Sequence, residues 1–318
     1  MEMLERLPTS YDLVYTWDYE SKVKELRHLY EKSKDLQWNA VSALKWDTDV
    51  DLESGAFPVE MMGIYGTPHY DRLTEREKKR LQVEFTSWIL SQFLHGEQGA
   101  LLATAQIVTA APAADAKFYA ATQVMDEARH VEVYDRYLRD KVGKEFPVNV
   151  HLKSLLDLVL QDSRWDMKYL GMQIMVEGLA LAAFGLIHSF TKEGLIKEIT
   201  RLVMTDEARH VAFGVLSLRG FYANLPPGEL REREDFVYES ARLMRDRFLA
   251  DEVWEAMGMD VEECKRLTLE SPGMIEFRRL LFSKIVPNLK RLDLLTPRVR
   301  AGFAELGVLD YETWEPSA

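Results

Sequence analysis

The chain has 318 residues, of which 47% are hydrophobic and 29% charged, a composition typical of a folded globular protein and not of a disordered or fibrous one. Its formal net charge of −12 repels phosphate backbones and anionic membrane surfaces, so we expect neither a nucleic-acid partner nor a membrane partner. Because Cys264 is the only cysteine, an internal disulfide and a cysteine-based metal site are excluded, and any redox metal must be bound by oxygen and nitrogen.

The first 75 residues are predicted to contain one helix and an irregular segment. Apolar and charged residues alternate at helical spacing over residues 19–35, whereas Gly and Pro recur from Asp47 to Tyr70. The N-terminus has no apolar stretch after a basic one, and the most apolar later segments contain Glu97 and Glu177. We therefore expect a cytoplasmic protein without a membrane span.

Two helical hairpins follow. Apolar residues recur with helical period up to Pro112, which interrupts the pattern, and Asp115 can cap the helix after it. After a loop and a short helix, a second pair of helices repeats this plan. The predicted helices cover residues 74–111, 115–142, 164–190 and 194–222, and together they form a four-helix bundle over residues 76–222.

Residues 223–318 are predicted to form helices at about 229–257, 261–269 and 274–293. None of these helices has a candidate cluster of metal ligands, so we expect them to pack outside the bundle. No run in the chain reads as a strand. The predicted fold class is all-α, with segments 1–75 and 223–318 packed on the bundle in one structural domain.

An internal repeat carries the candidate chemistry. The hexapeptide DEARHV occurs at residues 126–131 and again at 206–211, eighty positions apart. Thirty residues before the glutamate of each copy lies another glutamate, Glu97 in the first half and Glu177 in the second. The two hairpins are therefore duplicated modules.

The spacing predicts that these glutamates face each other. Pro112 lies midway between the two glutamates of the first hairpin and Lys192 midway between those of the second. Each glutamate is thus roughly 22 Å of helix from its turn, at 1.5 Å per residue. In the second helix of each hairpin, Glu and His three positions apart share one face, so both can point into the bundle.

Four carboxylates and two imidazoles form a mixed oxygen and nitrogen ligand set that suits iron or manganese, and their charge suits two divalent ions better than one. Without metal, burying so many ionisable groups in apolar helices is costly. The candidate metal ligands are Glu97, Glu127, His130, Glu177, Glu207 and His210.

A helix glutamate followed by D-E-x-R-H, twice in one chain, resembles the ferritin-like di-iron carboxylate oxygenases over about residues 85–220. The similarity is greatest to bacterial multicomponent monooxygenase hydroxylase subunits and acyl-CoA epoxidases, and less to the arylamine N-oxygenases. The resemblance implies a ferritin-like four-helix bundle built from two E…DExRH hairpins. It also implies that Glu97 and His130 bind one metal, that Glu177 and His210 bind the other, and that Glu127 and Glu207 bridge them.

The same resemblance implies hydrogen bonds around the ligands. Asp126 and Asp206 would each accept a bond from the ligand imidazole of the opposite repeat and fix its orientation. Arg129 and Arg209 would complete a charge network with them. The site also resembles that of the arylamine N-oxygenases, which have an extra histidine four residues before the last E-x-x-H. This chain has Val203 at that position.

Residues one turn from the ligands are predicted to border a substrate pocket, with bundle core as the alternative for each: Phe93, Leu101, Thr104, Gln123, Ile174, Leu181, Phe184, Val203 and Met204. Tyr134 is one turn after His130, so a redox role and a place in the core are both open.

The leading functional hypothesis is an oxygenase in which a reduced di-iron pair activates the co-substrate O2 and hydroxylates, epoxidises or N-oxygenates a small organic molecule. Iron oxidation or peroxide scavenging, and acyl desaturation along an apolar tunnel, remain alternatives. The additional terminal segments favour the enzyme, although they could build a homodimer interface. No flavin or nicotinamide fingerprint occurs, so we expect electrons from an external reductase. The ligand types leave Fe/Fe and Mn/Fe both open, with Fe/Fe preferred.

Overall fold

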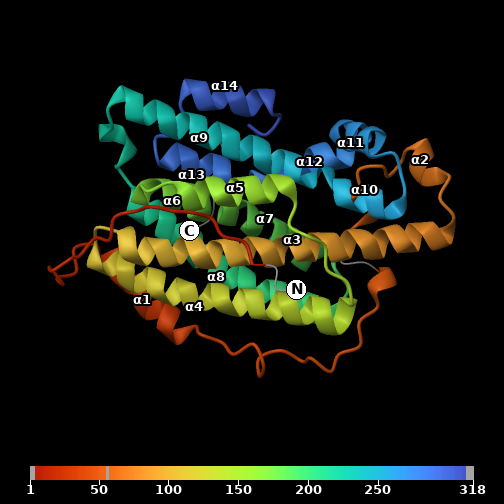
Figure 1. Cartoon of the computed structure of the whole chain (residues 1–318), viewed down its shortest axis with the longest axis horizontal. Helices are drawn as coiled ribbons and strands as arrows, with labels where there is room; N and C mark the ends of the chain where they lie inside the picture. Colours follow the sequence, from red (N-terminus) through yellow and green to blue (C-terminus); the bar gives the residue numbers. More distant parts are fainter. Residues whose placement is uncertain (1–3, 55–56, 313–318) are drawn as a thin grey trace.

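This computed structural model describes residues 4–54 and 57–312, in which the regular secondary structure is helical and no strand occurs. Four long helical segments form the bundle, and those of each hairpin pack along each other (Figure 1). The all-α bundle predicted from the sequence is confirmed. Its segments are α3 (Glu75–Ala110), α4 (Ala114–Tyr137), the continuous segment Trp165–Phe190, and α8 (Gly194–Leu218).

Local sequence signals fix where these helices begin and end. The α3 helix begins with a capping box, in which Thr74 N donates to Glu77 Oε2 at 2.8 Å and Glu77 N donates to Thr74 Oγ1 at 3.3 Å. It ends at Ala110, just before Pro112. The α8 helix is capped by Glu193, whose carboxylate accepts two backbone N–H bonds at 2.7 Å each. These boundaries place the metal-ligand candidates of each hairpin at one level.

The Trp165–Phe190 segment differs from the regular helix predicted for residues 164–190. It consists of α6 (Trp165–Tyr169), a π-helical turn, η4 (Leu170–Val176), and α7 (Glu177–Phe190). Hydrophobic spacing does not distinguish a π turn from an α turn, which is why the sequence did not reveal it. A Cβ on Gly171 would lie 2.5 Å from Val159 Cγ2, so close packing requires glycine in this turn. The π turn ends directly before Glu177 and sets the direction of that side chain.

This same segment is long and apolar enough to cross a membrane by length and composition. However, 72% of its most apolar window is buried inside the protein. The apolar character is therefore that of a helix in the core of a bundle.

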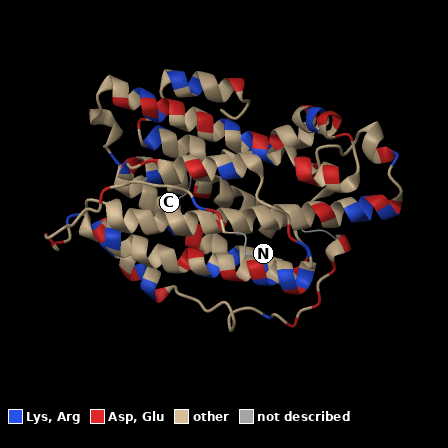
Figure 2. Cartoon of the chain, in the orientation of Figure 1, with Lys and Arg blue, Asp and Glu red and all other residues tan. Residues whose placement is uncertain are grey.

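The remaining helices surround the bundle. The α1 helix (Lys24–Asp35) packs on α4 and α8, and α5 (Val150–Gln161) packs on α3 and α9 (Pro227–Asp246). Figure 2 shows alternating charges at the start of α3 and on the outer helices, while the middle of α3 is largely uncharged. The other elements are α2 (Pro68–Asp71), α10 (Asp251–Met257), α11 (Val261–Glu270), α12 (Pro272–Leu281), α13 (Ile285–Arg291), α14 (Pro297–Glu305), and the short turns η1 (Leu52–Ser54), η2 (Val59–Met61), η3 (Leu138–Val142), η5 (Tyr222–Asn224) and η6 (Arg247–Leu249).

Two predicted C-terminal helices are interrupted. The helix predicted at 229–257 breaks between η6 and α10, where Ala250 has a φ of 58°. A left-handed residue that is not glycine or asparagine gives no signal in the sequence. The helix predicted at 274–293 is likewise divided into α12 and α13.

Candidate dinuclear metal centre

Six buried side chains from four helices meet inside the bundle. Their potential ligand atoms form two groups, and the atoms within each group lie within 4.8 Å of one another. One group contains Glu97, Glu127, His130 and Glu207, and the other contains Glu127, Glu177 and His210. The structure thus brings together all six residues singled out in the sequence, in two overlapping sets that suit two cations.

Glu127 and Glu207 each approach both imidazoles. The Glu127 oxygens lie 3.4 Å from His130 Nδ1 and 3.2 Å from His210 Nδ1. Glu207 Oε1 lies 3.4 Å and 3.6 Å from the same two nitrogens. Glu97 Oε2 lies 3.3 Å from His130 Nδ1 alone. Two carboxylates thus have access to both positions, whereas Glu97 belongs to one.

Several polar atoms in this cluster have no hydrogen-bond partner among the described residues. They include Oε2 of Glu127, Glu177 and Glu207, and Nδ1 of His210. Gln123 Nε2 donates to Glu127 Oε1 at 2.9 Å and to Glu177 Oε1 at 2.8 Å, which ties the two halves of the cluster together. Buried acceptors without partners are costly, and their oxygen and nitrogen chemistry fits a pair of hard cations.

The electrostatics of the cluster point the same way. Burial raises the pKa of Glu97 to about 8 and holds the pKa of Glu177 well above its usual value, in each case with the help of neighbouring carboxylates. Burial lowers the pKa of the imidazoles, but the charges of Glu97 near His130 and of Glu127 near His210 outweigh it and raise both pKa values well above normal. Without metal, protons bound to these carboxylates and imidazoles offset the buried negative charge. Bound cations would offset the same charge in their place.

Two aspartates orient the imidazoles across the repeat. His130 Nε2 donates to Asp206 Oδ2 at 3.2 Å, and His210 Nε2 donates to Asp126 Oδ2 at 3.2 Å. Each aspartate therefore serves the histidine of the opposite DEARHV copy. These bonds leave Nδ1 of both rings facing the four glutamates.

Two buried arginines balance the aspartates. Arg129 donates to Asp126 at 2.5 Å and to Asp206 at 3.1 Å, and Arg209 donates to Asp206 at 2.6 Å and to Asp126 at 3.3 Å. The result is a symmetric four-charge network beside the cluster. Such networks are stable only when each member is paired, as it is here.

The loop after α1 supplies two partners that the sequence analysis missed. Trp38 Nε1 donates to Asp206 Oδ2 at 2.8 Å, and Gln37 Nε2 donates to Asp126 Oδ1 at 2.8 Å. Gln37 Oε1 also accepts from Arg129 at 2.7 Å, and the Arg129 guanidinium lies 4.6 Å from the centre of the Trp38 ring. No repeat or spacing links this loop to the cluster, so the sequence contained no signal for either residue.

A narrow cavity of about 20 Å³ borders the cluster. Of the residues predicted to line a pocket, Phe93 and Phe184 do so, with ring centres 4.8 Å apart. Glu97, Glu177 and Glu207 form part of its wall. Its other lining residues are Gln92, Gly96, Ala100, Val176, Leu179, Ala180 and Arg247.

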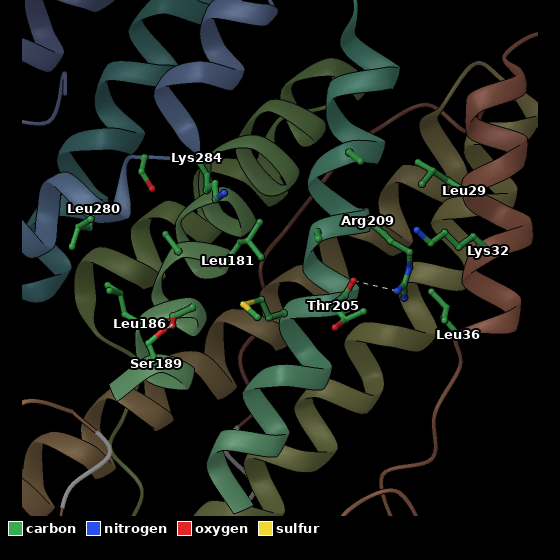
Figure 3. A pocket seen from close by; sticks show the side chains of 16 residues that line it. Leu29, Lys32, Leu36, Leu181, Leu186, Ser189, Thr205, Arg209, Leu280 and Lys284 are labelled. Carbon is green, nitrogen blue, oxygen red and sulfur yellow. Dashed lines mark hydrogen bonds between the residues drawn. The ribbon is translucent and has the colours of Figure 1, made fainter. Parts of the chain in front are cut away.

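The other predicted pocket residues lie elsewhere. Leu181 and Met204 line a groove of about 850 Å³ on the outer side of α7 and α8, between α1 and the end of α12 (Figure 3). Arg209 reaches this groove from the charge network. The remaining predicted residues do not border the narrow cavity and belong to the packed bundle instead: Thr104, Gln123, Ile174 and Val203 are fully buried, and Leu101 is half-buried.

Tyr134 is fully buried in an aromatic cluster with the two phenylalanines of the cavity, 6.0 Å from Phe93 and 6.1 Å from Phe184 between ring centres. Its hydroxyl has no hydrogen-bond partner among the described residues, and burial, aided by the charge of Glu97, raises its pKa well above normal. Position and burial suit both a core residue and a redox residue, so the redox role stays a prediction.

Comparison with solved structures supports the fold. The chain is similar to a variant R2-like ligand-binding oxidase with an anaerobically reconstituted Mn/Fe cofactor, at 19% identity and a TM-score of 0.52, over 87% of this chain and 95% of that one. It is similar to an R2-like ligand-binding oxidase with an aerobically reconstituted metal cofactor after photoconversion, at 17% identity and a TM-score of 0.50, with the same coverage. No curated protein matches the chain.

Residues 20–293 match the family model of p-aminobenzoate N-oxygenase AurF. The sequence resemblance to ferritin-like di-iron oxygenases is thus confirmed. At Val203 the chain differs from the N-oxygenases, for which the sequence analysis expected an additional histidine. The chain is an oxidoreductase of the oxygenase type, and its buried carboxylate and imidazole cluster fits a dinuclear metal site. It belongs to the p-aminobenzoate N-oxygenase AurF family.

Proposed function

We propose that this protein activates O2 at a dinuclear iron centre and N-oxygenates a primary aromatic amine. The observation that carries the proposal is the match to an N-oxygenase family over residues 20–293, which includes all six buried ligand candidates. Four carboxylates and two imidazoles are a ligand set on which iron can react with O2.

In this proposal Glu97 and His130 would hold one metal, Glu177 and His210 would hold the other, and Glu127 and Glu207 would be shared between the two. The approach of both bridging carboxylates to both imidazoles, at 3.2 to 3.6 Å, supports this division. When bound, the metal pair would supply the electrons and the open coordination positions that O2 reduction requires.

The chain's own residues have separate tasks in this reaction. Asp126 and Asp206 hold the imidazoles in one orientation, because each accepts a ring N–H. Gln123 fixes two of the carboxylates. Phe93 and Phe184 keep bulk water away from the cavity, where a dry environment strengthens every charge interaction with the substrate.

The cofactor and partners are part of the same proposal. We infer an Fe/Fe pair. Mn/Fe is the alternative, because a structurally similar oxidase contains Mn/Fe and the ligand types accept both. Electrons come from an external reductase. The protein works in the cytoplasm, without nucleic-acid or membrane partners, as a monomer or homodimer.

A second candidate is hydroxylation or epoxidation of a carbon atom. Val203 favours it, because the arylamine N-oxygenases have an extra histidine at this position and the other resembling oxygenases do not. Val203 is fully buried and can supply no ligand atom.

The two candidates are separated by supplying the iron-loaded, chemically reduced protein with isotopically heavy O2 and 4-aminobenzoate, aniline or an alkenyl benzene. We expect heavy oxygen on nitrogen, detected by mass spectrometry of the product. Heavy oxygen on carbon alone would contradict N-oxygenation and support the second candidate. Protein loaded with zinc, which cannot change its oxidation state, is the control for reactions that bypass the site.

A further inference from the structure

The narrow cavity beside the candidate metal ligands reaches the surface at two small residues. Gly96 of α3 and Ala180 of α7 line the cavity and are half-buried, whereas all of its other lining residues are buried. Gly96 and Ala180 therefore form the mouth of the cavity. The mouth leads directly to metal-ligand candidates, because three of the glutamates lie in the cavity wall.

Neither the backbone nor the packing of α3 requires glycine at position 96. Gly96 lies inside the helix and its φ is not positive. A Cβ built there would meet no atom within 4 Å beyond its own stretch of helix backbone. By contrast, a Cβ on Gly99 in the same helix would lie 2.4 Å from Leu156 Cδ2, so packing explains that glycine. Glycine is a poor helix former, and its presence at position 96 therefore needs another reason.

The internal repeat has a larger residue at the matching position of its second half. Val176 lies eighty positions after Gly96, just as Glu177 lies eighty positions after Glu97. All four of these residues line the narrow cavity. The duplicated module thus accepts a branched side chain directly before its first glutamate, and glycine occurs in the copy that forms the mouth.

The cavity as it stands has room for a molecule much smaller than an aromatic ring. Its volume of about 20 Å³ is close to the space that one water molecule needs. The rings of Phe93 and Phe184 must therefore turn aside on the inner side when a ring enters. Open space already exists beside Gly96, and a side chain at that position would occupy it.

We propose that Gly96 sets the size limit of the substrate entrance. The organic substrate reaches the metals between Gly96 and Ala180, and the missing side chain at position 96 lets an aromatic ring pass. Molecules of the size of O2 need less room, so they pass even when the side chain at position 96 is larger. The inference rests on the proposed function and adds the residue that limits the size of its substrate.

Calorimetry on the zinc-loaded protein tests the entrance without turnover, with azide as the small probe and aniline as the ring-sized probe. Gly96→Val should weaken the binding of aniline at least about tenfold, because the added side chain fills the space that the ring needs. It should leave the affinity for azide unchanged. Gly96→Ala adds a single methyl group and should weaken aniline binding to a smaller degree.

Gly185→Val is the matched control. Gly185 also lies inside a bundle helix, α7, but it lines the outer groove and not the narrow cavity. A Cβ on Gly185 would lie 3.8 Å from Met204 Sδ, which is an ordinary contact. This variant should keep the wild-type affinities for both probes.

A purely structural role of Gly96 makes a different prediction. If α3 needed glycine to pack, Gly96→Ala and Gly96→Val would lower the melting temperature and the zinc bound per chain. We expect unchanged zinc content and melting temperatures equal to or above that of the wild type, because alanine and valine both favour helix more than glycine does. If valine disturbed α3, Gly96→Ala alone would decide, and an unchanged aniline affinity would count against the entrance.

Three results would overturn the entrance: unchanged aniline binding in Gly96→Val, an equal loss of azide and aniline binding, or no aniline binding by the wild type. A graded loss of aniline binding from wild type to Gly96→Ala to Gly96→Val would support it. If the iron-loaded wild type bound aniline in this graded way but placed no oxygen on its nitrogen, the proposed function would fail and the entrance would stand. The two failures are therefore distinguishable.

Discussion

Trp38 donates a hydrogen bond to the aspartate that orients His130: its indole Nε1 lies 2.8 Å from Asp206 Oδ2, and that oxygen lies 3.2 Å from His130 Nε2. The indole is separated from Asp206 by 168 positions in the chain, yet it acts on a candidate metal ligand through a single carboxylate. The loop after α1 is therefore part of the support for the metal centre.

Trp38→Phe should weaken metal binding without unfolding the protein. Partners in the second layer around a metal typically contribute about 10- to 100-fold to its affinity, and we expect a loss near the lower end because the two arginines still hold Asp206. Competition with a coloured chelator measures the affinity. Trp46→Phe is the control, since Trp46 donates to the backbone oxygen of Ala40, away from the aspartates. Equal affinities in both variants would contradict a role for Trp38.

Glu127→Ala and Glu207→Ala should each abolish binding of the metal pair. Both side chains approach both imidazoles, so either loss removes a ligand from two positions at once. The metal-free variants should stay folded, but each loses a carboxylate that stabilises the protonated imidazole of His210, so neither should be more stable than the metal-free wild type. Elemental analysis gives the stoichiometry and circular dichroism the fold. Two metals retained by either variant would refute the bridging assignment.

Asp206→Asn should destabilise the protein by about 3 kcal/mol, because it leaves two buried guanidinium groups with one carboxylate between them. Arg129 and Arg209 both pair with Asp206 at present, at 3.1 and 2.6 Å. Urea unfolding measures the loss. Asp235→Asn breaks an exposed pair with Arg298, which water screens, so it should cost much less and serves as the control. Losses of similar size would indicate that the network contributes little.

Much of the site was predictable because it depends on short spacings. The two DEARHV copies and the glutamates thirty residues before them predict the four bundle helices. They also predict that the ligand candidates lie at one level along the bundle. Trp38 and Arg247 were not predictable, because their relation to the cluster depends on how the terminal segments fold back on the bundle. The π turn before Glu177 was missed since apolar spacing looks alike in α and π turns. The break at Ala250 was missed since alanine normally favours helix.

A buried lysine should make stability depend on pH. Lys168 is fully buried beside the end of α5, where its Nζ donates to Gln106 Oε1 at 2.5 Å, and burial lowers its pKa to about 8. In the unfolded chain the lysine keeps its proton up to about pH 10.4. Between about pH 8 and pH 10.4 the unfolded chain therefore binds more protons than the folded chain. The free energy of unfolding rises with pH across that window.

The Lys168→Met variant isolates this contribution. The free energy of unfolding of the wild type, minus that of the variant, should increase by about 1 kcal/mol per pH unit above about pH 8. Urea unfolding at neutral and alkaline pH provides the comparison, with Lys45→Met at an exposed position as the control. A constant difference would show that Lys168 titrates alike in both states.

The measurement that tests the central claim most directly is an anaerobic titration of the metal-free protein with Fe(II), with bound iron counted per chain. The six converging side chains predict saturation at about two ions per chain, as expected for four carboxylates and two imidazoles. In the same titration, the Glu127→Ala and Glu207→Ala variants should each saturate below two ions per chain. Saturation of the wild type at one ion, or no binding at all, would contradict a dinuclear centre in this bundle.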